Sequence, residues 1–177
     1  MNAPWWVRVL FGVTVVSTPS CVGEVQVPDA TSQPLLAPPR TGFENVADAM
    51  QPSCGTLDCH GQVGRNMRLF GARGLRLSAT DTSAEGVTQP PEYDADYWAI
   101  IALEPETMAT VVREKGDNPE RLTLIRKGRG TERHKGGKLM SPNDSLDRCI
   151  VGWVAGRIEV DACQAAAMIT APNGFVP

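Results

Sequence analysis

Cys54-Gly-Thr-Leu-Asp-Cys59-His60-Gly61 is the stretch around which the rest of the 177-residue chain is arranged. It places two cysteines close together, and a histidine directly follows the second one. Thiols in this order can add across the two vinyl groups of a haem, and the adjacent imidazole can then reach the iron. The stretch therefore predicts a covalent haem-attachment site.

The spacing within this stretch differs from the usual attachment motif, Cys-x-x-Cys-His, because four residues separate the cysteines. The spacer residues Thr56, Leu57 and Asp58 would have to bulge outward to keep the two sulfurs in place. A competing interpretation is a small-loop disulfide between Cys54 and Cys59 beside a surface histidine. Zinc is a third interpretation, which an oxidising compartment and the lack of a second cysteine pair at zinc-finger spacing disfavour.

The N-terminus has the outline of an export signal. Arg8 precedes an apolar run over residues 9–16, which is too short to span a bilayer as a helix. Small and turn-forming residues then lead to Cys21, in an arrangement that resembles the lipobox of bacterial lipoproteins. We expect a signal peptide over residues 1–20 and a lipid on Cys21 that anchors the protein to a membrane of the bacterial cell envelope, facing the periplasm or the cell surface. Ordinary cleavage near Ser20, leaving a soluble periplasmic protein, is the alternative.

Export also determines the state of the cysteines, because outside the cytoplasm they are normally bridged, acylated or haem-linked. Of the five cysteines, acylation of Cys21 leaves four. Either Cys54 and Cys59 hold haem while Cys149 and Cys163 form a disulfide, or all four form two disulfides, and the count alone does not choose. A disulfide between Cys149 and Cys163 would stabilise the domain by about 3 kcal/mol.

Length and composition fit one small domain with appendages. Hydrophobic residues make up 42% of the chain, which is enough for a core, and the net charge of −3 gives no indication of a nucleic-acid partner. Residues 21–40 are rich in proline and small polar residues, which predicts a flexible tether. The folded domain should therefore occupy residues 41–165 and be followed by a tail over residues 166–177.

The domain is predicted to be mainly α, and its first and last clear helices have the strongest signals. Thr41 and Glu44 match a capping box, and the helix that they open should stop before Pro52. Ser141 should cap the last clear helix, with Pro142 at the first helical position. Residues that share one helical face, and should therefore be buried, are Phe43, Val46, Ala47 and Met50 in the first helix and Leu146, Cys149, Ile150, Trp153 and Val154 in the last.

Three further helices and a loop are predicted between these two. Asp94 or Asp96 should cap a mostly buried helix that carries Tyr97 and Trp98. Prolines should start the next two helices, near residues 105 and 119. Residues 126–138 (RKGRGTERHKGGK) are expected to form a basic, glycine-rich loop, by default a solvated surface. A more specific interpretation is that Arg126, Lys127 or Arg129 pairs with haem propionates or with an acidic redox partner.

The order of these features resembles that of small class I c-type cytochromes. A helix precedes the Cys…Cys-His-Gly stretch, further helices follow, and a glycine-rich loop that ends at Met140 leads into a last helix with Trp153 and Gly156. The resemblance covers the layout of residues 41–158 and implies a cytochrome c-like helical domain. It also implies that the first and last helices pack across each other, with Phe43 near Trp153.

The resemblance further implies a role for each residue of the site. Cys54 and Cys59 would form the thioethers to haem c, His60 would be the proximal iron ligand, and Met140 the distal ligand, with His134 as its alternative. Two axial ligands leave no open position on the iron, so the implied role is electron transfer with redox partner proteins and not enzymatic catalysis. The alternative function is a haem-less, disulfide-stabilised envelope lipoprotein that acts as a binding or structural module.

Overall fold

The structure is a computed structural model that describes residues 35–169 of the chain. Helices dominate this part, and its only strand pairing is an isolated bridge between Phe70 and Leu75. The prediction of a mainly α domain is therefore confirmed. The predicted signal peptide, the lipidation site at Cys21 and residues 21–34 of the predicted tether lie outside the described residues. None of the helices within 35–169 has the length and apolar character needed to cross a bilayer.

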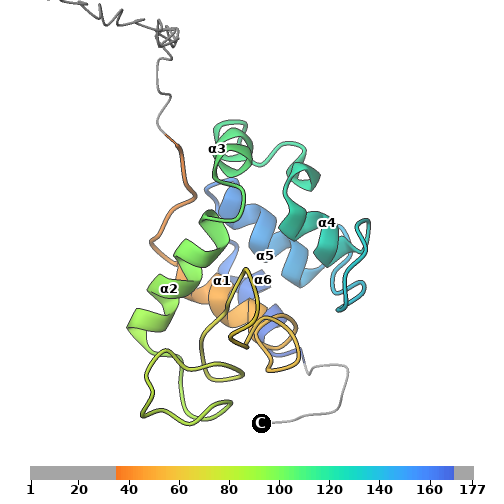
Figure 1. The fold of residues 1–177 in the computed structure, drawn as a ribbon. Helices are drawn as coiled ribbons and strands as arrows, with labels where there is room; N and C mark the ends of the chain where they lie inside the picture. Colours follow the sequence, from red (N-terminus) through yellow and green to blue (C-terminus); the bar gives the residue numbers. More distant parts are fainter. Residues whose placement is uncertain (1–34, 170–177) are drawn as a thin grey trace, which may run out of the picture. The chain divides into compact units, whose positions relative to one another are not determined.

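Helices α1, α5 and α6 lie together, with α2 on one side of them and α4 on the other (Figure 1). Two long loops complete the domain, one between α1 and α2 and one between α4 and α5. The helices in chain order are α1 (Phe43–Met50), α2 (Pro90–Ile101), α3 (Pro105–Arg113), the 3-10 helix η1 (Pro119–Arg121), α4 (Thr123–Arg129), α5 (Ser145–Val154) and α6 (Val160–Ala167).

Three aromatic side chains join α1, α2 and α5 in the core. The ring centroid of Phe43 lies 5.0 Å from that of Trp153 and 5.3 Å from that of Tyr97. The indole of Trp153 donates a hydrogen bond to the carbonyl of Pro39, and the hydroxyl of Tyr97 donates one to the carbonyl of Pro38, both at 2.8 Å. The expected contact between Phe43 and Trp153 is confirmed, and the chain just before α1 is tied to the same core.

Two helix starts differ from the sequence prediction. Gly42, at φ 81°, is the N-cap of α1 and no side chain caps this helix, so the capping box expected at Thr41 is wrong. Asp144 caps α5 by accepting a 2.9 Å hydrogen bond from the backbone N–H of Asp147, so the cap expected at Ser141 is wrong as well. In both cases the buried face was predicted correctly, because hydrophobic spacing determines it independently of the cap.

Helix α2 begins earlier than predicted. Gln89 is its N-cap, and the carboxylate of Glu92 completes a capping box by accepting a 2.8 Å hydrogen bond from the Gln89 backbone N–H. The expected cap at Asp94 or Asp96 is therefore wrong, and Asp96 lies inside the helix with none of its surface exposed. Trp98, which was expected to be mostly buried, is 62% exposed.

The segment expected to be a basic loop begins inside a helix. Arg126, Lys127 and Arg129 belong to α4, so their placement in a loop is wrong. Arg129 forms a 2.8 Å ion pair with the buried carboxylate of Asp147, which joins α4 to α5, and Arg126 forms a 2.8 Å pair with Glu132. These two arginines are therefore engaged in holding α4 in place.

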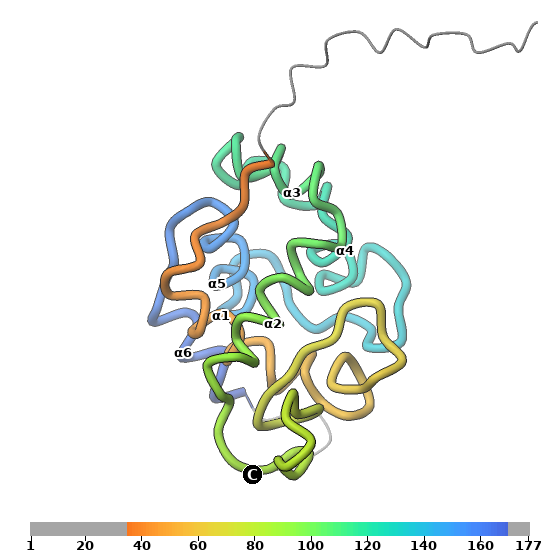
Figure 2. The backbone as a smooth tube through the Cα atoms, turned by 60° about the vertical axis from the view of Figure 1, so that its left-hand side comes forward, coloured from red at the N-terminus to blue at the C-terminus, as the bar shows by residue number. Residues whose placement is uncertain are grey.

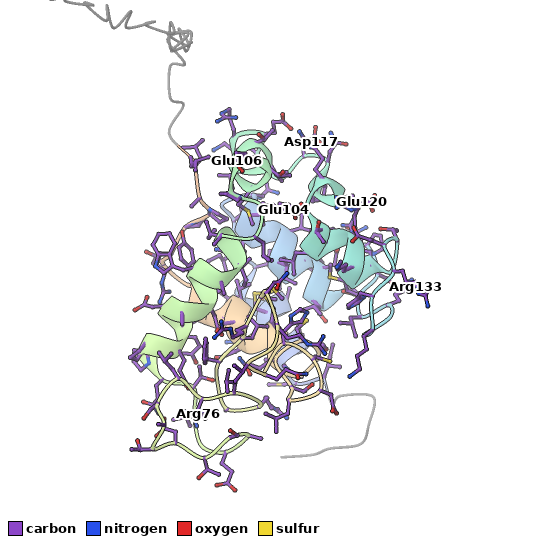
Figure 3. All side chains as sticks on the ribbon, in the orientation of Figure 1. Arg76, Glu104, Glu106, Asp117, Glu120 and Arg133 are labelled. Atoms are coloured by element: carbon purple, nitrogen blue, oxygen red, sulfur yellow. A yellow bond between two sulfur atoms is a disulfide. The ribbon has the colours of Figure 1, made fainter. Side chains whose placement is uncertain are left out.

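Covalent and ionic links hold the remaining pieces. Cys149 and Cys163 form the expected disulfide, which joins α5 to α6. Arg76 lies in the long loop below α2 (Figure 3), where its guanidinium pairs with the buried carboxylate of Glu92 at 2.8 Å and donates to the carbonyl of Val87 at 2.8 Å. The loop between α1 and α2 is thus attached to α2 although it has little regular structure of its own.

Candidate functional site

A cavity of about 510 Å³ lies beside the loop that follows α1. Cys54, Cys59 and His60 line it from that loop, and Met140 lines it from the segment before α5. His134, from the loop between α4 and α5, lines the same cavity. The fold therefore gathers around one space the side chains that the sequence singled out as attachment sites and iron ligands, although they lie far apart along the chain.

The loop that carries the two cysteines begins directly at the end of α1. The backbone N–H of Cys54 donates to the carbonyl of Met50 at 2.7 Å, so the first cysteine is held by the last turn of the helix. The backbone N–H of His60 then donates back to the carbonyl of Cys54 at 2.9 Å. This hydrogen bond closes the spacer into a loop whose tip, Leu57, is 47% exposed, as expected for a spacer that bulges outward.

Three glycines allow the backbone of this region to cross itself closely. A Cβ atom on Gly61 would collide with the carbonyl oxygen of Gly55 and would lie 2.9 Å from the Cα of Gly74. Any larger residue at position 61 would push these backbone segments apart. Gly61 therefore lets the backbone next to His60 pack closely against the backbone of Gly55 and Gly74.

A hydrogen bond selects the tautomer of the His60 ring. Nδ1 of His60 lies 2.9 Å from the backbone carbonyl oxygen of Met67. Because that oxygen only accepts hydrogen bonds, Nδ1 carries the proton and Nε2 of the neutral ring keeps its lone pair. A backbone carbonyl that binds the far nitrogen is the usual support of a metal-ligating histidine. Met67 supports the site through its backbone, a role that the sequence did not indicate.

The two cysteines of the site are free thiols. Cys54 is buried, and this burial, together with the nearby Cys59, raises the pKa of its thiol to about 12. The thiol of Cys54 is therefore protonated at neutral pH and shielded from solution oxidants. Among residues 35–169 only Cys149 and Cys163 are bridged, so the interpretation with a second disulfide does not describe this structure.

Helix α4 holds Met140 against the cavity. The carbonyl of Gly128 accepts hydrogen bonds from the backbone N–H groups of Met140 at 3.0 Å and Leu139 at 2.8 Å. The Met140 side chain, 2% exposed, lies against Gly128, where an added Cβ would come within 2.5 Å of its Cε. Sequence reasoning missed Gly128, although a glycine inside a helical segment is a signal of close packing at that position.

His134 brings a second imidazole to the cavity. Its Nδ1 is buried and has no hydrogen-bond partner among the described residues. Burial, followed by the positive charge of Lys127, lowers the pKa of His134, so that the ring is neutral at pH 7. Figure 2 shows its loop beside the loop that carries the cysteines, and Lys135 links the two by donating to the Asp58 carbonyl at 3.1 Å. His134 thus remains the alternative to Met140.

Comparison with protein-family models, with curated proteins and with solved structures gives no match for this chain.

The ligating groups surround a space and do not converge on a point. Within the part of the chain that the structure describes, no three His, Cys, Asp or Glu side chains are placed to hold a metal ion. A bare ion would contact only one or two of them. An occupant that fills a cavity of about 510 Å³ would contact them together, and this volume lies within the range of cofactor sites.

The residues present fit a haem in number and in kind. Cys54 and Cys59 offer two unbridged thiols, and His60 offers an imidazole with a free Nε2. Leu146 and Ile150 of α5 add a buried apolar wall, with 3% and 1% of their surfaces exposed. Of the three basic residues proposed to meet propionates or a partner, only Lys127 lines the cavity.

Proposed function

We propose that this protein is an electron carrier that holds one covalently attached haem in the cavity beside α1. A single observation carries the proposal: two free thiols, an imidazole whose Nδ1 is hydrogen-bonded to a backbone carbonyl, and a buried thioether line the same cavity. These are the groups that attach and ligate haem in the small c-type cytochromes whose layout the sequence resembles.

Each residue has a distinct task in this proposal. Cys54 and Cys59 would attach the haem, His60 would hold its iron through Nε2, and Met140 would supply a second iron ligand. A haem held by histidine and methionine exchanges one electron at a potential that this ligand pair and burial raise. Leu146 and Ile150 give the cavity a buried apolar wall, which adds to that effect.

The proposed location is the bacterial cell envelope, with a lipid on Cys21 as the membrane anchor. The apolar run after Arg8 and the cysteine that follows it support export. The disulfide between Cys149 and Cys163 fits the same compartment, because structural disulfides persist in oxidising surroundings. Redox partner proteins in the envelope are part of the proposal, since an electron carrier needs a donor and an acceptor.

The proposal is tested by producing the full chain together with a c-type haem-attachment system. We expect a pyridine haemochrome spectrum of covalent haem and an intact mass that corresponds to one haem per chain. The C54A/C59A double variant should lose the covalent haem, whereas H134A, the matched control on the cavity wall, should keep it. A colourless protein with the mass of the bare polypeptide would reject the proposal and leave a disulfide-stabilised envelope module.

A further inference from the structure

Two buried polar side chains hold the backbone of Phe70 from different helices. Oδ1 of Asp96, on α2, accepts a hydrogen bond from the Phe70 N–H at 2.7 Å. Nε2 of Gln51, at the end of α1, donates to the Phe70 carbonyl at 2.7 Å. Asp96 is fully buried and Gln51 is 4% exposed. We call this pair of side chains the Phe70 clamp.

The segment that ends at Phe70 is the one that supports the proposed iron ligand. The Met67 carbonyl oxygen lies 2.9 Å from Nδ1 of His60, and the Leu69 N–H donates to the His60 carbonyl at 2.9 Å. The side chains of Met67 and Leu69 are themselves buried, at 6% and 1% exposure. Residues 67–70 thus contact His60 at one end and the Phe70 clamp at the other.

The clamp is costly for a purely structural feature. Oδ2 of Asp96 and Oε1 of Gln51 are both buried without a hydrogen-bond partner among the described residues. A buried polar atom without a partner costs free energy that an apolar side chain of similar size would avoid. In return for this cost, the carboxyl and the amide satisfy the N–H and the carbonyl of Phe70 and hold its backbone from two different helices.

We propose that Asp96 and Gln51 are positioning residues for His60: by holding both backbone groups of Phe70, they keep the Met67 carbonyl where it fixes the proton on Nδ1 and leaves Nε2 free. The identity of the ligand that Nε2 meets rests on the proposed function. The tautomer itself belongs to the polypeptide and exists before any haem is attached.

Loss of the clamp has a defined consequence for the ring. Without its two hydrogen bonds, the Phe70 backbone is held less firmly, and we expect the Met67 carbonyl to shift with it. The Nδ1–H form of His60 then loses its acceptor, and the Nε2–H form, which cannot ligate a metal through Nε2, becomes populated. A defect in helix packing alone would not change which nitrogen of His60 carries the proton.

The test is nitrogen-15 NMR of the haem-free full chain at a pH at which the imidazole is neutral, because long-range proton–nitrogen correlations distinguish the two tautomers. In the wild type His60 should be predominantly Nδ1–H. In Asp96→Leu and Gln51→Leu the Nε2–H fraction should rise several-fold. Asp96→Asn, which keeps an oxygen as the acceptor for the Phe70 N–H, should restore the wild-type tautomer.

The matched control is Tyr93→Phe. Tyr93 lies on α2, and its hydroxyl donates a 2.9 Å hydrogen bond to Asp48 of α1, so this variant removes a polar contact between the same helices without touching Phe70. It should leave the His60 tautomer unchanged. If Asp96→Leu does not fold, Gln51→Leu provides the test. A wild-type tautomer of His60 in the folded leucine variants would refute the positioning role of the Phe70 clamp. A missing haem with the tautomer result intact would overturn only the proposed function.

Discussion

Asp96 shows how far the surroundings of one residue can change its chemistry. Burial, only partly opposed by the hydrogen bond from the Phe70 N–H and reinforced by the charges of Glu92 and Asp48, raises the pKa of its carboxyl to about 8. The carboxyl is therefore mostly protonated in the folded protein at neutral pH. Because Oδ1 accepts from the Phe70 N–H, Oδ2 is the oxygen that is free to carry this proton.

This raised pKa makes the stability of the fold depend on pH. An aspartate in the unfolded chain ionises near pH 4, so between about pH 4 and 8 the folded state binds the extra proton. The free energy of unfolding should therefore fall as pH rises through this range, by up to about 1.4 kcal/mol per unit. Urea unfolding at pH 5 and pH 8.5 measures the loss. Asp96→Asn should reduce the loss, because its side chain does not ionise.

The control for this prediction is Asp94→Asn on the same helix. The Asp94 side chain is 64% exposed, so its replacement should leave the pH dependence close to that of the wild type. An equal loss of stability between pH 5 and pH 8.5 in Asp96→Asn and in the wild type would contradict the raised pKa.

At the scale of residues, sequence reasoning singled out side chains that the structure places around one cavity. The spacing of Cys54, Cys59 and His60 made them recognisable, and Met140 followed from its place before the last clear helix. Asp96 was mistaken for a helix cap, and no sequence pattern indicated the contacts that Gln51, Met67 and Gly128 make. These residues act through backbone groups or through close packing with distant segments. Such contacts cannot be predicted from the spacing of residues along the sequence.

Helix α4 is the element that positions the second wall of the cavity. It places Gly128 against the end of the Met140 side chain, where a Cβ would lie 2.5 Å from Cε and 3.1 Å from Sδ. The contact involves the flexible tip of the methionine, so that tip can move without disturbing the fold. Helix α4 therefore has a larger effect on the position of the Met140 thioether than on the stability of the domain.

Gly128→Ala should separate these two effects. Alanine favours a helix over glycine by about 1 kcal/mol, which should offset the crowding and keep the free energy of unfolding within about 1 kcal/mol of the wild type. The methyl resonance of Met140 should nevertheless shift clearly in a carbon-13 spectrum of methionine-labelled protein. Gly64→Ala is the matched control, because Gly64 also lines the cavity but its added Cβ meets nothing within 4 Å. A Met140 resonance unchanged by Gly128→Ala would refute the contact.

At the scale of elements, buried faces were more predictable than helix ends. The apolar stripes of α1 and α5 repeat at helical spacing, whereas caps depend on which of several nearby polar residues reaches a free N–H group. Asp144 and Glu92 reach such groups, while Ser141 and Thr41 do not. The long loop between α1 and α2 has no periodicity, and the contacts of Arg76 that hold it to α2 could not be read from the sequence.

The whole domain consists of two regions that are held together by different means. Helices α1, α5 and α6 form a packed core, in which Cys149 and Cys163 add a covalent link. The cavity borders this core at Leu146 and Ile150 of α5, and its other walls include two loops rich in glycine that hydrogen bonds such as that from Lys135 to Asp58 connect.

This division predicts which segments of the chain a covalently attached haem would stabilise. In the haem-free protein, amides of residues 54–69 and 130–140 should exchange with deuterium much faster than those of α5, because local opening there breaks few contacts. Covalent haem should slow exchange in both loops by an order of magnitude or more, since it would join them through Cys54, Cys59 and Met140, and exchange in α5 should change far less. Hydrogen-exchange mass spectrometry of the haem-free and haem-bearing proteins measures this, with the C54A/C59A variant as the control that stays at the haem-free rates. Protection confined to residues 54–69 would mean that Met140 and its loop do not contact the haem, and would direct the search for the second ligand elsewhere.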